Sequence, residues 1–171
     1  TREFLARGRQ EKSIKSFRHC QISTETCSCI ISNCPIVQDT RIKRHNYICG
    51  MLTDVVKKNN WVVFQEPHTW DEKNELYKPD LIFVKDGKAY VVDVTVWYEY
   101  YRSLFNNKMK VAANEKVKKY EHLHQQVREL TSARDVTFVG FPLGARGKGC
   151  SRNFELLSVL GLSKSRQEKT A

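Results

Sequence analysis

The sequence predicts a single α/β domain in which helices pack against a sheet. Its 171 residues suffice for one domain with a hydrophobic core. Hydrophobic periodicity indicates the order helix, strand, strand, strand, helix, strand, helix, which is typical of one α/β domain. A hydrophobic content of 40% and a charged content of 28% are those of a globular chain.

The first half of the domain begins with an amphipathic helix. Apolar residues recur at helical spacing from Arg41 to Lys58, and Asn59-Asn60 ends this helix. WVVFQEP (61–67) is a predicted strand, and the polar residues 68–78 form a predicted loop. The β-rich runs DLIFVK and KAYVVDVTV flank Asp86-Gly87, a dipeptide that strongly favours a two-residue hairpin turn.

The second half contains three further elements. A long amphipathic helix is predicted from about Lys108 to Leu130, and VTFVGFPLG (136–144) is a predicted strand. FELLSVLGL (154–162) is the last helical segment that the sequence indicates. The residues that follow are polar, so we expect a disordered tail over 162–171.

The charge of the chain favours a polyanionic partner. There are 29 Lys and Arg against 19 Asp and Glu, which gives a net charge of +10, and nucleic acid is the commonest polyanion. No run of about 18 apolar residues is present, so we expect no association with a membrane. The chain begins with Thr and has no apolar signal region, which favours a fragment or processed piece of a longer protein.

The candidate chemistry lies in the predicted hairpin. A two-residue turn at Asp86-Gly87 pairs Lys85 with Lys88, and this register places Asp80 directly opposite Asp93. Facing carboxylates in an apolar hairpin repel one another unless a cation lies between them, and Mg²⁺ favours one or two carboxylates with water and phosphate oxygens. The alternative is that Asp80 is a turn residue and a buried salt bridge holds Asp93.

The long helix adds candidate cations to this site. Its apolar stripe consists of Ala113, Val117, Tyr120, Leu123, Val127 and Leu130. Lys116 lies near the centre of the stripe and Lys119 on its border, so Lys116 is directed toward the core and needs an anionic partner. Such a lysine could neutralise charge on a reacting phosphate or help to deprotonate water. The alternative is a lysine whose amine reaches solvent while its stem packs.

The hairpin resembles the PD-(D/E)xK motif of restriction-like nucleases, because Pro79-Asp80 is followed by Asp93 in a hydrophobic strand. Thr95 stands where the motif's lysine usually lies, and in a branch of this family the lysine is on the following helix, as Lys116 and Lys119 are here. KPDLIFVKDGKAYVVDVTVWYE, EKVKKY and CPIVQDTRIKRHNYIC are similar to the C-terminal part of the Pol polyprotein of site-specific non-LTR (type-1) retrotransposable elements, of the kind that inserts into insect ribosomal RNA genes.

This resemblance implies a fold, an activity and a set of partners. The fold would be a restriction-endonuclease-like mixed sheet flanked by helices. The activity would be Mg²⁺- or Mn²⁺-dependent nicking of double-stranded target DNA in the nucleus, which primes reverse transcription by an RNA-directed DNA polymerase located upstream. Element RNA and a second protomer for second-strand cleavage would be further partners. Asp80 and Asp93 would be the metal ligands, and Lys116 and Lys119 the catalytic lysines. The alternative is a catalytically dead DNA- or RNA-binding module from a degenerate element copy.

The resemblance also implies a zinc knuckle before the nuclease. Phe17 occupies its first ligand position, and the remaining positions make Cys20, Cys29 and Cys34 the expected Zn²⁺ ligands. The fourth ligand stays open between His19, Cys27 and His45. A degenerate knuckle without zinc is the alternative.

The basic residues Arg41, Lys43, Arg44 and His45 follow directly and are candidate phosphate-binding residues, although a solvated helix face needs no function. The expected domain organisation comprises an upstream linker at 1–16, the knuckle-like segment and basic helix at 17–58, the nuclease domain at 59–161 and the tail at 162–171.

Overall fold

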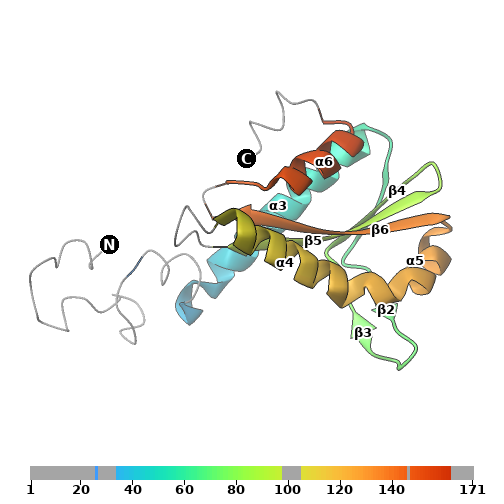
Figure 1. The fold of residues 1–171 in the computed structure, drawn as a ribbon, viewed down its shortest axis with the longest axis horizontal. Coiled ribbons are helices and arrows are strands. Elements are labelled where there is room, and N and C mark those ends of the chain that lie inside the picture. Colours follow the sequence, from blue (N-terminus) through green and yellow to red (C-terminus); the bar gives the residue numbers. More distant parts are fainter. Residues whose placement is uncertain (1–25, 27–33, 98–104, 146, 163–171) are drawn as a thin grey trace, which may run out of the picture.

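A four-stranded mixed sheet, with strand order β1-β4-β5-β6, forms the centre of the protein in the computed structural model (Figure 1). The structure describes Thr26 and residues 34–97, 105–145 and 147–162. Its elements are η2 (Pro35–Val37), α3 (Gln38–Lys58), β1 (Val62–Gln65), β2 (Thr69–Trp70), β3 (Leu76–Tyr77), β4 (Leu81–Lys85), β5 (Lys88–Trp97), α4 (Phe105–Tyr120), η4 (Glu121–Leu123), α5 (His124–Thr131), β6 (Asp135–Gly144) and α6 (Ser151–Val159).

The hairpin register is confirmed. β4 and β5 pair antiparallel from Lys85↔Lys88 to Leu81↔Val92. Asp86 and Gly87 have φ values of 51° and 73°, the left-handed conformation that a two-residue turn of type I′ requires at both positions. The sheet is mixed because β5 pairs in parallel with β6 on its other side.

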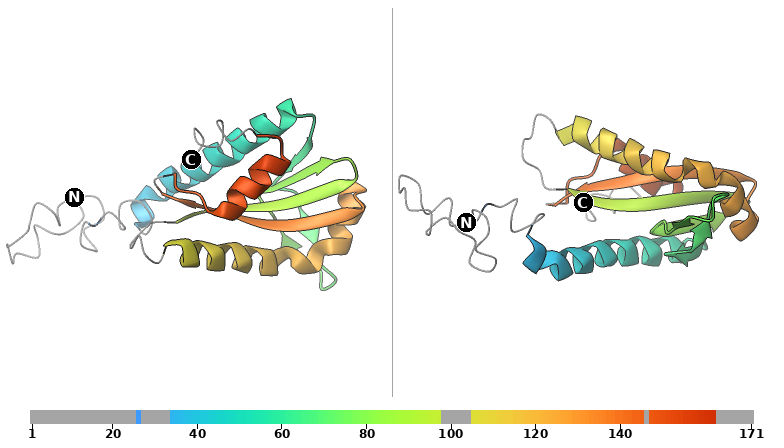
Figure 2. Two further views of the ribbon diagram at one scale, coloured as in Figure 1. Left: turned by 45° about the horizontal axis from the view of Figure 1, so that its top comes forward. Right: turned by 90° about the horizontal axis from the view of Figure 1, so that it is seen from below.

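Helices cover both faces of the sheet, and Figure 2 shows α3 and α4 on opposite sides of it. On one face, α3 and α6 pack on the sheet in a core that includes Val56, Phe83 and Leu160. On the other face, η4 and α5 pack on a second core that includes Val91 and Leu123. Side chains alternate along a strand, so β5 contributes Val92 and Val94 to the first core and Ala89 and Val91 to the second.

Two element predictions need correction. The predicted helix 108–130 is divided into α4, η4 and α5, because Tyr120 adopts φ −118° and ψ −12° at the end of α4. The predicted polar loop 68–78 contains the antiparallel pair β2–β3. Its turn is closed by the Asp71 side chain, which accepts hydrogen bonds from the backbone N–H groups of Lys73 and Glu75 at 2.9 and 2.7 Å.

The base of this β2–β3 excursion is closed by a single backbone hydrogen bond. The N–H of Glu66 donates to the carbonyl of Asp80 at 2.9 Å, so the chain leaves β1 and returns to β4 at adjacent points. The other predicted elements are confirmed, with α3 starting at Gln38 instead of Arg41 and α6 at Ser151. None of the helices within the described ranges has the length and apolarity needed to cross a bilayer.

Candidate functional site

The acidic hairpin ends where β5 continues beyond its neighbour β4. The ladder between them stops at Leu81↔Val92, and the same register extended by one residue places Asp80 alongside Asp93. Asp93 is buried, with 4% of its surface exposed. It lies on the same face of β5 as Val91, and therefore faces the layer of α4 and α5.

Lys116 of α4 forms an ion pair with Asp93, with 2.7 Å between the lysine Nζ and Oδ1 of the carboxylate. The lysine side chain is 31% exposed and the carboxylate 6%, so the inward direction expected from the helical stripe is confirmed. A buried carboxylate requires such a partner, because an unpaired charge in a protein interior is strongly destabilising. The core-facing lysine expected on the helix is therefore the partner in the salt bridge expected at Asp93.

Gly140 allows α4 to lie this close to the sheet. It is the β6 partner of Asp93, and a Cβ atom built at position 140 would be 2.6 Å from the Cα atom of Ala113 in α4 and closer still to its carbonyl oxygen. Side chains essentially never approach backbone at such distances. The absence of a side chain at position 140 thus sets the height of α4 above Asp93 and lets Lys116, one turn further along, reach the carboxylate.

Asp80 is held by different partners. Its Oδ2 atom accepts a hydrogen bond from the backbone N–H of Val94 at 2.6 Å, an N–H group that has lost its ladder partner because β4 has ended. The same Oδ2 atom lies 3.1 Å from Nε2 of His45, which comes from α3 on the opposite face of the sheet. The second oxygen of Asp80, Oδ1, has no hydrogen-bond or ion-pair partner among the residues that the structure describes.

His45 is cationic in this arrangement. The hydrogen bond to Asp80, and next the contact with Cys49, raise the pKa of His45 to about 11 against the opposing effect of burial. The Cys49 Sγ atom lies 3.9 Å from Nδ1 and 4.0 Å from Nε2 of the ring. His45 is one of the expected phosphate-binding residues and one of the three open candidates for the fourth zinc ligand. The structure places it in contact with the acidic hairpin, and both roles remain predictions.

Tyr120 connects the remaining candidate lysine to the site. Its hydroxyl donates to the carbonyl oxygen of Lys78 at 3.1 Å and accepts from Nζ of Lys119 at 2.9 Å. The Lys119 Nζ atom also lies 4.6 Å from the centroid of the Tyr120 ring. Burial, and secondly the interaction with Asp93, raise the pKa of Tyr120 above its ordinary value, so the group remains a neutral phenol. Lys119 thus reaches the carboxylates through Tyr120, whereas Lys116 touches Asp93.

Thr95 occupies the place of the lysine in the PD-(D/E)xK motif. It lies two residues after Asp93 and so on the same face of β5. Its Oγ1 atom is buried and has no hydrogen-bond partner within the described part of the chain. Each of these two oxygens, Oγ1 of Thr95 and Oδ1 of Asp80, could accept a hydrogen bond from water or bind a cation.

The predicted zinc ligands fall mostly outside the described residues. Cys20 and Cys29 lie there, as do the alternative fourth ligands His19 and Cys27. Cys34 is buried, with 2% of its surface exposed, directly before η2. The zinc knuckle remains a prediction.

The predicted phosphate-binding residues lie on the first turns of α3. Lys43 is exposed, and Arg41 and Arg44 are half-buried. Burial, followed by repulsion from Arg41, lowers the pKa of Arg44.

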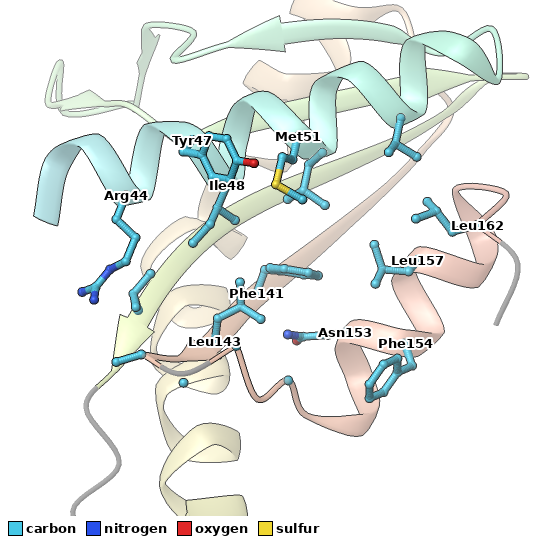
Figure 3. Close-up of a pocket in the computed structure, with 17 residues that line it drawn as sticks. Arg44, Tyr47, Ile48, Met51, Phe141, Leu143, Asn153, Phe154, Leu157 and Leu162 are labelled. Atoms are coloured by element: carbon cyan, nitrogen blue, oxygen red, sulfur yellow. The ribbon is translucent and has the colours of Figure 1, made fainter. Parts of the chain in front are cut away.

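Arg44 also stands at the edge of an apolar cavity of about 210 Å³ between α3, β6 and α6. Figure 3 shows Met51, Phe141 and Leu157 lining it. None of Asp80, Asp93 and Lys116 lines this cavity, so it is separate from the acidic site.

Two residues of the site were not among the sequence-based candidates. Tyr120 was assigned only to the apolar stripe, although it follows Lys116 by four residues and therefore shares its helix face. Cys49 follows His45 at the same spacing, which is the signal that could have identified the pair. Neither spacing reveals which carboxylate the face of α4 or the face of α3 contacts.

Comparison with known proteins identifies relatives of this chain. No family model matches it. A Retrovirus-related Pol polyprotein from type-1 retrotransposable element R2 of Popillia japonica is 34% identical over 143 residues, which cover 81% of this chain and 19% of that protein. A second one from the same organism is 28% identical over 144 residues, 83% of this chain and 29% of the relative.

The polyprotein of the same name from Bradysia coprophila is 28% identical over 163 residues, or 95% of this chain and 18% of the relative. The chain thus spans less than a third of the length of these curated relatives. Most of its sequence, including both carboxylates and the helices that contact them, is homologous to one segment of the Pol polyproteins of R2 type-1 retrotransposable elements.

Proposed function

We propose that this chain contains a metal-dependent endonuclease domain of the restriction-like type, which nicks target DNA. The observation that carries the proposal is that the strand register places Asp80 alongside Asp93, which pairs with Lys116, where β5 passes the end of β4. Two acids and a lysine on a mixed sheet flanked by helices are the parts that hydrolysis of a phosphodiester requires.

The residues present fit a divalent cation. Asp80 has one oxygen without a partner in the described structure, and the unpartnered Oγ1 of Thr95 lies on the Asp93 face of β5. Asp80 and Asp93 would hold Mg²⁺ or Mn²⁺ with water and a phosphate oxygen. The bound ion would supply a water of lowered pKa and polarise the scissile phosphate.

Lys116 is the better supported of the two catalytic lysines. Its ammonium group is 2.7 Å from Asp93 and partly exposed, so it can also meet a phosphate oxygen placed against that carboxylate and neutralise the charge that develops there. Tyr120 fixes the start of the hairpin through the Lys78 carbonyl and orients Lys119. We therefore assign Lys119 and Tyr120 to positioning.

The basic start of α3 supports a duplex DNA substrate. Arg41, Lys43 and Arg44 precede His45 on the same helix, and His45 contacts Asp80, so phosphates bound along this helix would lead to the acidic site. The nick would provide a 3′ hydroxyl for reverse transcription by the polymerase of the polyprotein. Element RNA, a second protomer, a zinc knuckle at 17–34 and action in the nucleus belong to the same proposal.

One observation favours a second candidate, a nucleic-acid-binding module that does not cut. Each carboxylate already has a cationic partner within the chain, Lys116 for Asp93 and His45 for Asp80. A chain in which these pairs persist would bind phosphates through its basic residues without binding a catalytic cation.

The test is nicking of supercoiled plasmid by the full chain with Mg²⁺ or Mn²⁺, compared with a chelator. Asp80→Asn, Asp93→Asn and Lys116→Met each should reduce nicking at least about 100-fold, the scale of a lost charge-stabilising group. Asp54→Asn, which removes an exposed carboxylate of α3, is the matched control and should nick normally.

DNA binding distinguishes the two candidates. Retention of the plasmid by all variants, weakened by salt and unaffected by chelator, with no nicking by the native chain, would favour the binding module. Equal nicking by the native chain and both Asp variants would reject the proposed site.

A further inference from the structure

Three side chains that bind transition metals meet on the α3 side of the acidic hairpin. His45 and Cys49 are separated by four residues and therefore project from the same face of α3. Asp80 reaches them from the start of β4. One ligand atom from each of the three residues lies within 4.8 Å of the other two.

We infer that His45, Cys49 and Asp80 form a binding site for a transition-metal ion of the zinc class, with a fourth coordination position open to solvent. A nitrogen, a sulfur and an oxygen ligand suit Zn²⁺ or Co²⁺ and not Mg²⁺, which favours oxygen alone. The bound ion would replace the proton of the His45 ring and that of the Cys49 thiol, and both protons would pass to solvent. Three protein ligands and one exchangeable water are typical of zinc sites that remain accessible.

The separations between the ligand atoms fit tetrahedral coordination. Tetrahedral zinc with ordinary bond lengths places a nitrogen and an oxygen ligand about 3.4 Å apart, and a nitrogen and a sulfur ligand about 3.6 Å apart. The corresponding separations are 3.1 Å between His45 Nε2 and Asp80 Oδ2, and 4.0 Å between His45 Nε2 and Cys49 Sγ. Small rotations of these half-buried side chains would close the differences.

The surroundings of the site allow an ion to enter. The side chains of His45 and Asp80 are 29% and 19% exposed, and Cys49 is half-buried and has a free thiol. The site is distinct from the contact between Asp93 and Lys116, which lies toward α4. Asp80 is common to both, so the inference and the proposed nuclease need separate readouts.

The experiment is a titration of the full chain with Co²⁺. Binding is monitored by the thiolate-to-cobalt charge-transfer absorption, which reports a Co–S bond. Cys20, Cys27 and Cys29 are replaced by serine and the buried Cys34 by alanine in the parent chain, so that the predicted knuckle does not contribute thiolates. The test variants are Cys49→Ala and His45→Ala. Cys150→Ala, which removes a buried thiol hydrogen-bonded to Asn153, is the matched control.

We expect the parent chain and Cys150→Ala to show the absorption with the same affinity. Cys49→Ala should abolish it, and His45→Ala and Asp80→Asn should each weaken Co²⁺ binding at least about 10-fold. Circular dichroism of each variant establishes that the fold is retained.

No thiolate absorption in the folded parent chain, or an unchanged absorption in Cys49→Ala, would overturn the inference. Asp93→Asn separates this result from the proposed nuclease, because it should keep the Co²⁺ absorption while it loses nicking. Absorption without nicking by the native chain supports the metal site alone, and nicking without absorption supports the nuclease alone.

Discussion

The two carboxylates of the acidic hairpin differ in how the fold holds them. Asp93 lies within β5, between two paired neighbours, and is buried against Lys116. Asp80 lies one residue outside β4, is half-buried, and is held by a backbone N–H and by His45 from the opposite layer. We conclude that Asp93 is the rigid half of the site, because strand pairing and burial fix it. Asp80 is the adjustable half, because its position depends on the contact with His45 of α3.

The largest effect is expected from Lys116→Met. This change leaves Asp93 buried without its cation, and breaking a buried pair costs on the order of 3–5 kcal/mol. Urea unfolding measures the loss. The double variant Asp93→Asn/Lys116→Met should recover most of it, because no unpaired charge remains. Equal stability of Lys116→Met and the native chain would show that Asp93 is not rigidly paired.

A smaller loss is expected from Gly140→Ala. The added methyl group overlaps the backbone of Ala113, and overpacking of this kind costs about 1–3 kcal/mol. It also raises α4 away from Asp93, so nicking should fall by more than the loss of folded protein explains. Gly50→Ala is the control, since a Cβ there meets nothing within 4 Å and should stabilise α3 by up to about 1 kcal/mol.

Asp80→Asn should destabilise the fold less than either change. An asparagine still offers a carbonyl oxygen to the N–H of Val94. The expected cost is that of weakening this hydrogen bond and of losing the partly exposed ion pair with His45, together about 1 kcal/mol. Urea unfolding beside Lys116→Met measures the difference between the two carboxylates directly. A cost for Asp80→Asn equal to or above that of Lys116→Met would contradict the assignment of Asp80 as the adjustable half.

The smallest effect is a pH dependence of the Asp80 side. The pKa of His45 is raised to about 11 in the folded chain, so the stability that its proton provides is fully present below about pH 6.5, the unfolded value. It is lost progressively as the pH rises through the folded value. The difference in Tm between the native chain and His45→Gln should therefore narrow between pH 6.5 and 9.5.

The pH dependence of this Tm difference should require Asp80. The same comparison made in an Asp80→Asn background should show a much weaker pH dependence, because the hydrogen bond to the Asp80 carboxylate, the largest cause of the raised pKa of His45, is weakened. A Tm difference that stays constant over this pH range in the native background would contradict the contact between His45 and Asp80.

The sequence predicts the surroundings of Asp93 better than those of Asp80. The register that aligns Asp80 and Asp93 depends on a local turn, and the inward direction of Lys116 on helical periodicity, so both could be derived from neighbouring residues. His45 and Asp80 are 35 residues apart in the sequence. Their contact depends on which face α3 turns toward the sheet, and this is decided by tertiary packing and not by neighbouring residues.

The break after Tyr120 has a similar origin. No glycine or proline marks it, and the hydroxyl contact with Lys78 forms only once helix and hairpin are packed. Sequence periodicity therefore predicts one continuous helix there. The strands β2 and β3 have only two residues each, which is too short to give a strand signal of their own.

The hydrogen bond between Glu66 and Asp80 closes a loop, and the number of residues in this loop can change without disturbing the sheet. Because it joins the two ends of the β2–β3 excursion, residues 67–79 form a loop whose closure entropy grows only slowly with added length. A segment inserted near the turn after Asp71, away from the Tyr120 contact, would lengthen the excursion without moving the carboxylate at its base. This loop is accordingly an attachment point for a fluorophore or an added recognition peptide beside the proposed cutting site.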